Sequence, residues 1–243
     1  FDKEVIDTEL QLKDLESVEK KILRIEKVAK SGDAKAKKEL EVLVRFRDGL
    51  KSGLNARAIE IEKEDLEIIR DLQLLTIKPV LYVANVDEGS IQTGNKYVEE
   101  LRNKVQEENA EVIVLCAALE SQIAEFEDPE EKELFLSEYG LEESGLNKLI
   151  SAAYSLLDLI TYFTAGPQEV RAWTIKKGWK APQAAGVIHT DFERGFIKAE
   201  VIKLADYQQF KTEAACRENG KIAIEGKEYI VKDGDIMHFR FNV

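Results

Sequence analysis

The chain has few of the residues that stabilise disulfide-bonded or metal-dependent proteins. Its 243 residues include two cysteines, Cys116 and Cys216, and two histidines, His189 and His238. Two thiols 100 positions apart give neither a disulfide framework nor a CxxC metal motif, and no metal-ligand cluster is visible. His189 is interpreted as a packing and hydrogen-bonding residue, and His238 lies on a predicted terminal strand. A reduced, cytoplasmic compartment is the simplest interpretation.

Long hydrophobic runs and an excess of positive charge are also missing. No segment approaches 18 consecutive apolar residues, so no membrane-spanning helix is predicted, and no signal peptide is visible. The net charge of −12 argues against a protein that binds duplex DNA through a broad basic face. Residues 1–157 carry −13 and residues 158–243 carry +1. Because the sequence begins with Phe1, we expect it to start inside a longer protein.

Residues 1–75 are predicted to form a helical hairpin, followed by a third helix over 63–74. Apolar residues recur every three or four positions from Leu15 to Ala29, which is the spacing of a coiled-coil seam. Ser31-Gly32-Asp33 interrupts the pattern, and a second apolar stripe runs from Ala36 to Leu50. A short connection favours antiparallel packing. Seven lysines crowd the tip side, either as a solvated helix surface or as a basic tip that contacts RNA or an acidic partner: Lys20, Lys21, Lys27, Lys30, Lys35, Lys37 and Lys38.

Residues 76–157 are predicted to alternate strands and helices, which indicates βαβ units in a parallel sheet. The expected order is a buried strand over 80–84, an amphipathic helix over 95–107 and a strand over 112–115. A helix started by Pro129 follows, and another then buries an apolar face between Leu146 and Leu157. The apolar face of the first helix should consist of Tyr97, Val98, Leu101 and Val105. Two strands do not make a stable doubly wound sheet, so further strands are expected before Phe1.

Residues 158–243 have the pattern of a compact α+β domain. Strands are expected over 169–175, 197–202, 221–224, 227–231 and 237–241. A short helix is expected from Pro182 to Ile188 and a longer one over 206–217. Residues 157–166 are the predicted linker.

The C-terminal part resembles a TGS domain, a ubiquitin-like β-grasp module. Three segments carry the match: 181–191 (APQAAGVIHTD), 195–200 (GFIKAE) and 231–236 (VKDGDI). Together with the hairpin and the segment Asn85-Val86-Asp87-Glu88, the chain resembles the Obg-like ATPases of the YchF family over essentially its whole length. The resemblance implies α/β and α+β architecture in three domains: a coiled-coil hairpin (1–75), the C-terminal part of an OBG-type P-loop G domain (76–157) and a TGS domain (158–243).

One motif of that family is absent. The sequence contains no GxxxxGK[ST], the phosphate-binding loop that supplies a lysine and a magnesium-binding hydroxyl. The family's N-terminal P-loop half is therefore not in these residues. We expect no catalytic residue and no metal ligand in this chain, and no hydrolysis by the chain alone.

The segment after the first predicted strand resembles the base-reading motif Asn-Lys-x-Asp of P-loop GTPases, with Val86 in place of Lys and Glu88 in place of Asp. In a guanine reader the Asp carboxylate accepts hydrogen bonds from the ring N–H and the exocyclic amine. Adenine presents an acceptor instead, so a buried carboxylate facing it is costly. The two replacements therefore weaken guanine selectivity, and the resemblance implies a preference for ATP. Asn85 on its own is equally a strand-end turn residue.

A second base-side loop is expected after the strand over 112–115. Cys116, Ala117 and Ala118 match the family's version of the Ser-Ala-Lys loop, and their small side chains let the backbone approach the base. Cys116 alone is equally a small buried hydrophobic residue.

Four basic residues interleaved with Trp173 and Trp179 form the best candidate RNA-facing patch, because aromatic and basic side chains together suit RNA. The alternative is a solvated strand edge with core tryptophans. The candidates are Arg171, Lys176, Lys177 and Lys180.

The resemblance implies a cytoplasmic switch that, in full-length form, binds and hydrolyses ATP, and GTP less well, with Mg²⁺. It would associate with the ribosome or RNA through the TGS domain and the hairpin, most simply as a monomer, without binding a membrane or duplex DNA. Two alternatives stay open: a non-enzymatic RNA- or ribosome-binding module, and an adaptor that uses the coiled coil as a protein-binding arm.

Overall fold

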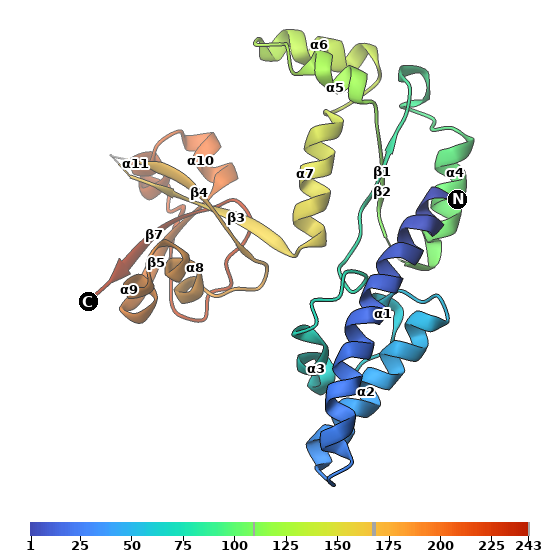
Figure 1. Ribbon diagram of the computed structural model, residues 1–243. Coiled ribbons are helices and arrows are strands. Elements are labelled where there is room, and N and C mark those ends of the chain that lie inside the picture. Colours follow the sequence, from blue (N-terminus) through green and yellow to red (C-terminus); the bar gives the residue numbers. More distant parts are fainter. Residues whose placement is uncertain (109, 167–168, 243) are drawn as a thin grey trace. The chain divides into compact units, whose positions relative to one another are not determined.

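The computed structural model describes residues 1–108, 110–166 and 169–242. Contacts divide the chain into two units, Phe1–Val114 and Leu115–Val243. Each unit has its own arrangement of helices and strands (Figure 1).

The first unit begins with the predicted antiparallel hairpin, formed by α1 (Asp2–Ala29) and α2 (Ala34–Lys51) (Figure 1). The seam residues Val18 and Ile22 are buried against Leu43 and Phe46. Gly32 ends the first helix with a φ of +97°, a conformation that glycine adopts without steric cost. The side chain of Asp33 accepts a hydrogen bond from the Ala36 N–H and so caps α2.

The predicted third helix is shorter than expected. A 3₁₀ turn, η2 (Lys63–Asp65), leads into α3 (Leu66–Arg70), and another, η1 (Ala56–Ala58), precedes both. The prediction of helix through Leu74 is wrong, because Gln73 has a φ of +47°. This turn directs Leu74 into the hairpin core, where it is buried.

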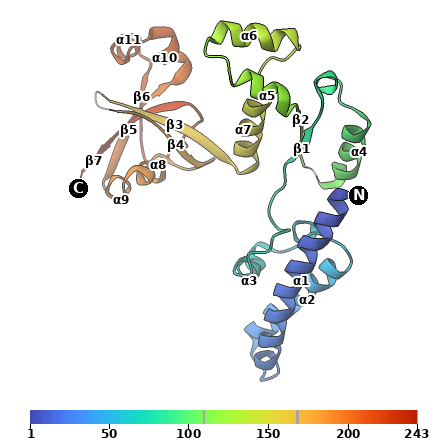
Figure 2. The ribbon, with the colours of Figure 1, turned by 45° about the horizontal axis from the view of Figure 1, so that its top comes forward.

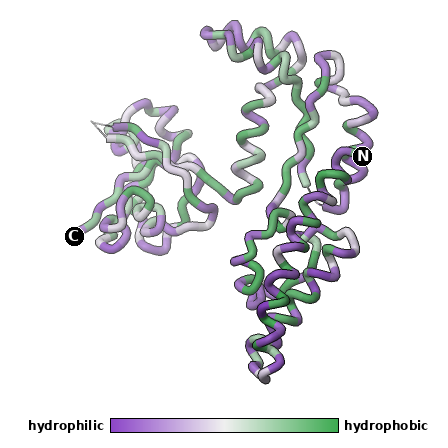
Figure 3. Tube along the Cα trace, in the orientation of Figure 1, coloured by the Kyte–Doolittle hydropathy of each residue, from purple (hydrophilic) through white to green (hydrophobic). Residues whose placement is uncertain are grey.

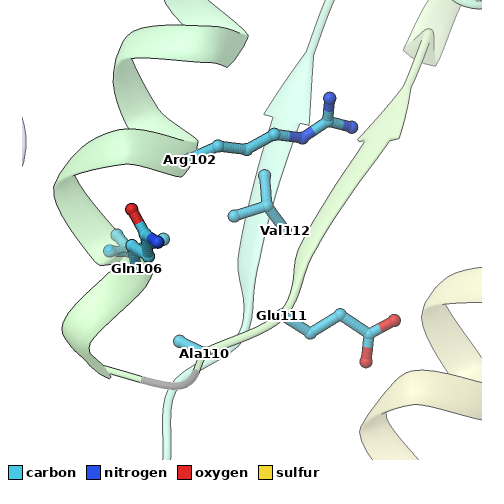
Figure 4. Close-up of a pocket in the computed structure, with 6 residues that line it drawn as sticks. Arg102, Gln106, Ala110, Glu111 and Val112 are labelled. Atoms are coloured by element: carbon cyan, nitrogen blue, oxygen red, sulfur yellow. The ribbon is translucent and has the colours of Figure 1, made fainter.

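A βαβ segment completes the first unit. It consists of β1 (Tyr82–Asn85), η3 (Glu88–Ser90), α4 (Lys96–Val105), η4 (Gln106–Glu108) and β2 (Val112–Leu115). The two strands form a two-stranded sheet and run in the same direction, as predicted (Figures 1 and 4). Asn95 caps α4 through its side-chain oxygen, which accepts from the N–H groups of Tyr97 and Val98.

Two burial predictions for this segment are wrong. The first strand begins at Tyr82, not Val80, and Val83 is 44% exposed because β2 is the only strand paired with β1 in the described chain. Tyr97 is 65% exposed, whereas Val98 and Val105 are buried. Consecutive helical residues point about 100° apart, so Tyr97 lies off the buried stripe.

The second unit starts with three helices, α5 (Ala117–Ile123), α6 (Pro129–Glu138) and α7 (Gly145–Leu156). Pro129 occupies the first position of α6, as predicted, and Asp128 caps it. The prediction that the apolar face of α7 is buried is wrong for three of its residues. Leu146, Ile150 and Leu157 are about half exposed, because no described element covers that side of the helix.

A five-stranded sheet and four helices, α8 to α11, form the rest of the second unit (Figure 2). The strand order is β4-β3-β7-β5-β6, with β3 and β7 parallel and the other pairs antiparallel. Buried Tyr162, Val201 and Met237 of the sheet pack with Ala184 and Ala185 of α8. The bounds are β3 (Leu159–Ala165), β4 (Val170–Lys176), α8 (Ala181–Ile188), α9 (Thr190–Arg194), β5 (Phe196–Lys203), α10 (Leu204–Phe210), α11 (Glu213–Glu218), β6 (Ile222–Glu225) and β7 (Asp235–Phe241).

Three predictions for this region are wrong. The predicted linker over 157–166 contains the strand β3. The single helix expected over 206–217 is two helices, α10 and α11, separated at Lys211, which has a φ of +65°. The strand expected over 227–231 is reduced to an isolated bridge between Ile230 and Lys180.

No helix of the described chain is long and apolar enough to cross a membrane. Among the same residues, no group of three or more His, Cys, Asp or Glu is placed to hold a metal ion.

Candidate nucleotide-base segments and RNA-facing surface

The predicted base-reading residues lie in the loop that follows β1. Asn85 is the last residue of the strand and is exposed. Val86 is half-buried, and Glu88 is exposed at the start of η3. The loop is held by its own backbone, since the N–H of Ser90 donates to the Asp87 carbonyl at 3.1 Å. A ligand could therefore approach Asn85 and Glu88 without displacing a packed side chain.

A buried carboxylate holds the chain just upstream of β1. Asp14 of α1 is 2% exposed and accepts three hydrogen bonds: from the N–H of Leu75 at 2.6 Å, the N–H of Thr76 at 2.8 Å and the Thr76 hydroxyl at 2.7 Å. The same hydroxyl oxygen accepts from the Ala56 N–H at 2.8 Å. Asp14 thus ties the segment that enters β1 to the hairpin.

A second polar cluster reaches β1 itself. The carboxylate of Glu108 accepts from the Tyr82 hydroxyl at 2.9 Å, from Arg57 at 2.8 Å and forms an ion pair with Lys3 at 2.6 Å. Burial alone would raise the pKa of Glu108, but the hydrogen bonds from Lys3, Arg57 and Tyr82 outweigh it and keep this pKa below its ordinary value. Tyr82 lies three positions before Asn85, so the cluster fixes the strand that carries the loop.

Sequence reasoning missed both clusters. Asp14 did leave a signal, because it continues the buried spacing of Val18 and Ile22 at intervals of four residues. A carboxylate at such a position needs buried donors. The sequence gives no such signal for Glu108, because its partners Tyr82 and Arg57 lie 26 and 51 positions away along the chain.

The second predicted base-side loop directly follows β2. Cys116 is 2% exposed and stands at the N-cap position of α5, and Ala117 and Ala118 are exposed in the first turn. The burial of Cys116 agrees with its interpretation as a small buried hydrophobic residue. The loop after β1 belongs to the first unit and the loop after β2 to the second, so each loop is described within its own unit.

Glu120 has a structural role beside this loop. Its carboxylate accepts from the N–H groups of Gly145 at 2.7 Å and Leu146 at 3.1 Å, at the N-terminus of α7. Backbone N–H groups at a helix start lack intrahelical acceptors, and a negative charge there is favourable. Glu120 therefore fixes α5 to α7 and supports the position of Ala117 and Ala118.

An open groove of about 380 Å³ lies between the end of α4 and the start of β2 (Figure 4). Arg102 extends from α4 across the strands, and Glu111 points away from it (Figure 4). The lining contains none of the predicted base-reading residues: it consists of Arg102, Val105, Gln106, Ala110, Glu111 and Val112. This groove is therefore separate from the candidate base segments.

The candidate RNA-facing residues lie on and beyond β4, an edge strand of the five-stranded sheet. The guanidinium of Arg171 stacks 4.1 Å from the centre of the Trp173 ring. Lys176 donates to the Leu157 carbonyl at 2.9 Å, and Lys180 pairs with the exposed Glu228. Lys177 is exposed in the turn after the strand.

These four cations do not share one face of the sheet. Side chains alternate along a strand, so Arg171 lies on the face of Trp173 and Ile175, and Lys176 lies on the opposite face. Trp173 and Trp179 are partly buried and pack against the core, as the alternative interpretation expected. The basic residues therefore follow the edge of the sheet.

Comparison with known proteins identifies the relatives of this chain. Residues 159–242 match the family model YchF-GTPase_C, described as "Protein of unknown function (DUF933)". The "Ribosome-binding ATPase YchF" of Bacillus subtilis is 53% identical over all of the chain, which spans 66% of that relative. The protein of the same name from Mycoplasma genitalium is 41% identical, with 67% of its length covered. The chain belongs to the YchF family.

Solved structures agree with the YchF assignment. The structure of the Schizosaccharomyces pombe YchF GTPase matches 97% of this chain with a TM-score of 0.84 and 37% identity, and the match covers 64% of that protein. A GTP binding protein from Pyrococcus horikoshii matches with a TM-score of 0.58 and 17% identity, a likeness of fold alone. The expected fold class, with a hairpin, part of a P-loop NTPase sheet and a β-grasp module, is thereby confirmed.

Proposed function

We propose that this chain supplies the base-binding and ribosome-docking parts of a cytoplasmic protein that, in full-length form, binds and hydrolyses ATP, and GTP less well. The observation that carries the proposal is membership of the YchF family, whose curated relatives are named ribosome-binding ATPases. Because the chain spans 66% of those relatives, the activity belongs to the whole protein. No residue of this chain is assigned to the phosphates or to Mg²⁺.

The exposed loop after β1 supports the proposed base selectivity. A guanine base needs a carboxylate positioned to accept from two adjacent N–H groups, and Glu88 is one methylene longer than the Asp of a guanine reader. Val86 lacks the long stem of the lysine that packs over the base. Asn85 keeps an amide that can contact the base, and Cys116, Ala117 and Ala118 are small enough for close backbone approach.

We further propose that Arg171, Lys176, Lys177 and Lys180 contact ribosomal RNA along the edge of the sheet. The Arg171–Trp173 stack supports this, because a guanidinium held over an aromatic ring stays exposed and oriented. The partners that Lys176 and Lys180 have in this chain are surface contacts, which are weak and readily exchanged.

Restoring the guanine-reading residues tests the nucleotide proposal. In the full-length protein, Val86→Lys combined with Glu88→Asp should raise the affinity for GTP relative to ATP by about tenfold, equivalent to roughly 1.4 kcal/mol. Equilibrium titration with fluorescent ATP and GTP analogues measures the ratio. The matched control is Val187→Lys with Glu99→Asp, the same replacements at exposed positions on helices away from the loop. An unchanged ratio in a variant that still binds nucleotide would contradict the proposed base site.

A ribosome-binding module without hydrolytic activity is the second candidate. The exposed cations on and beyond β4 favour it, because their proposed contact with RNA would need no nucleotide. Ribosome binding by the full-length protein that is equal with and without nucleotide would support this candidate over a switch.

A further inference from the structure

A groove of about 460 Å³ lies on the face of the five-stranded sheet opposite α8. Val201 and Met237 pack toward α8, and side chains alternate along a strand, so Ile202 and Ile236 point to the other face. Helices α10 and α11 lie on that side of the sheet (Figures 1 and 2), and Tyr207 of α10 is part of the lining. The volume is in the range of small-ligand and peptide pockets, and neither the base segments nor the RNA-facing edge uses this groove.

The groove is apolar at one end and positively charged at the other. At the apolar end, Ile222, Ile202 and Ile236 are neighbours on β6, β5 and β7. Four residues farther along β5 and β7, Lys198 lies opposite Arg240 on the same face of the sheet. Hydrophobic and hydrophilic residues accordingly both lie along these strands (Figure 3). We call the two ends the isoleucine end and the cationic end. At about 3.3 Å per residue they are about 13 Å apart.

Arg240 is only loosely held within the chain. Its Nε and Nη2 lie 3.4 and 3.3 Å from the same oxygen of Glu200, which is longer than the usual distance of about 2.9 Å, and its side chain is 53% exposed. Arg217 donates to the other oxygen of Glu200 at 2.9 Å and is the main cause that keeps the pKa of Glu200 below its ordinary value. Glu200 therefore keeps a partner when Arg240 turns to a ligand.

Two more basic side chains lie beside Arg240. Lys198 is half-buried opposite it, and His238 is exposed two residues before it on β7. Neither side chain forms a hydrogen bond or ion pair with any residue of the described chain. Lys198 and the two arginines outnumber the carboxylates Glu200 and Glu213 by three to two. An excess of positive charge at this end favours an anionic group.

An elongated ligand with a carboxylate at one end and an apolar group at the other matches this lining. A guanidinium binds a carboxylate through two parallel hydrogen bonds, and the isoleucine end favours an apolar side chain that leaves water. Between the two ends the lining is polar, with Glu200 and His238. Peptide groups can form hydrogen bonds there, whereas a hydrocarbon chain cannot.

We propose that this groove binds the carboxy-terminal residues of a partner polypeptide, with the terminal carboxylate at the cationic end and a hydrophobic side chain at the isoleucine end. The length of the groove sets the position of that side chain. An extended peptide rises about 3.4 Å per residue, so its fourth residue from the end lies about 12 Å from the terminal carboxylate. This matches the separation of the two ends, and we expect Leu, Ile or Val at that position.

Synthetic pentapeptides test the proposal on the full-length protein. Each peptide is acetylated, consists of Ser and Gly with a single Leu at one of the five positions, and is made with a free and with an amidated carboxy terminus. Binding is followed from the NMR signals of the methyl groups of Ile202, Ile222 and Ile236 at up to about 5 mM peptide, where even a complex with a millimolar Kd is populated. The free acid with Leu fourth from the end should shift these signals most. Its amide should bind at least about tenfold more weakly, because it loses the charge-assisted pair.

Two charge-matched variants locate the carboxylate. The site variant combines Lys198→Gln with Arg240→Gln. The control variant combines Lys148→Gln with Arg194→Gln, at exposed positions of α7 and α9, and neither residue lines the groove. The site variant should lose the preference for the free acid, and the control variant should keep it. Circular dichroism melting checks that both are folded, and the comparison of acid with amide on the wild-type protein is decisive without either variant.

A second pair of variants locates the hydrophobic side chain. Ile222→Thr keeps a β-branched residue in β6 but removes apolar surface from the groove, so it should weaken the binding of both peptide forms about threefold or more. Ile224→Thr makes the same replacement at an exposed position of the same strand that does not line the groove, and binding should not change.

Every other outcome counts against the proposal. If none of the free-acid peptides shifts the three methyl signals, the groove does not bind a carboxy terminus. Equal affinity for acid and amide would contradict recognition of the terminal carboxylate. If octanoate, which has a carboxylate and an apolar chain without peptide groups, binds more tightly than the best peptide, the groove takes small amphipathic acids instead. Equal losses in the site and control variants would assign the effect to overall charge. Each of these results leaves the proposed function intact, since nucleotide and ribosome binding are measured separately.

Discussion

At the scale of single residues, Asp14 holds the segment that leads into β1. Replacing it with Ala leaves the part-buried N–H group of Leu75 and the buried N–H group of Thr76 without their acceptor. Unsatisfied buried donors cost about 1–3 kcal/mol each, so we expect Asp14→Ala to lower the free energy of unfolding by about 2–4 kcal/mol. Urea denaturation measures the loss. The control Glu9→Ala removes an exposed carboxylate from the same helix and should cost less than 0.5 kcal/mol. A similar loss in both variants would contradict this role for Asp14.

Glu108 should make the stability of the first unit depend on pH. Its pKa in the folded protein lies below the ordinary value of 4.5, so the carboxylate stabilises the fold fully above about pH 4.5. That stabilisation is lost as the pH falls through the lower, folded-state pKa. At pH 7 we expect Glu108→Gln to cost about 1–3 kcal/mol, because the side chain receives hydrogen bonds from charged groups and is only 19% exposed.

The measurement for Glu108 is the difference in unfolding free energy between wild type and Glu108→Gln at pH 7, pH 5 and pH 3. The difference should be constant between pH 7 and pH 5 and should shrink at pH 3. The neighbouring Glu107→Gln, at an exposed position, is the control. If the difference in unfolding free energy grew as the pH fell, the pKa of Glu108 would be raised in the folded protein and not lowered.

At the scale of elements, the break between α10 and α11 depends on one non-glycine residue with a positive φ. Lys211 has a φ of +65° and a ψ of −18°, a conformation that costs a residue with a Cβ about 1 kcal/mol relative to glycine. We expect Lys211→Gly to stabilise the second unit by about 0.5–1 kcal/mol, measured by thermal denaturation. Lys211→Ala also loses the charge but keeps the Cβ, so it should bring no gain. Equal stabilisation by both replacements would assign the effect to charge instead.

Elements with local signals could be predicted from the sequence, but the burial of some of their residues could not. Gly32 and Asp33 mark the hairpin turn, and Pro129 marks a helix start, through chemistry that acts within four residues. The exposure of Val83 and Leu146 depends instead on which elements cover them. The strand β3 pairs with the neighbouring β4 and with the distant β7, but its residues were predicted to form a linker.

The residues of the candidate site also divide into those that a local sequence signal indicates and those that it does not. Asn85 and Cys116 were predicted at strand ends, where the structure has them, because strand ends are visible in sequence. Asp14 and Glu108, which support the strand before Asn85, have partners 61 and 51 residues away, and no local pattern identifies those partners. The alternation that places Arg171 and Lys176 on opposite faces could have been anticipated once β4 was recognised as a strand.

At the scale of the whole molecule, the two units have separate cores, one in the hairpin and one in the five-stranded sheet. A change that weakens one core should therefore leave the other intact. We expect Asp14→Ala to accelerate amide hydrogen exchange in residues 10–80 by about 30-fold or more, since about 2 kcal/mol corresponds to that factor, and to leave residues 160–240 within twofold of wild type. Lys211→Gly provides the reciprocal test, with slower exchange confined to the second unit. Mass spectrometry of peptides from both variants resolves the two regions. Accelerated exchange in both regions of Asp14→Ala would mean that the chain unfolds as one cooperative body.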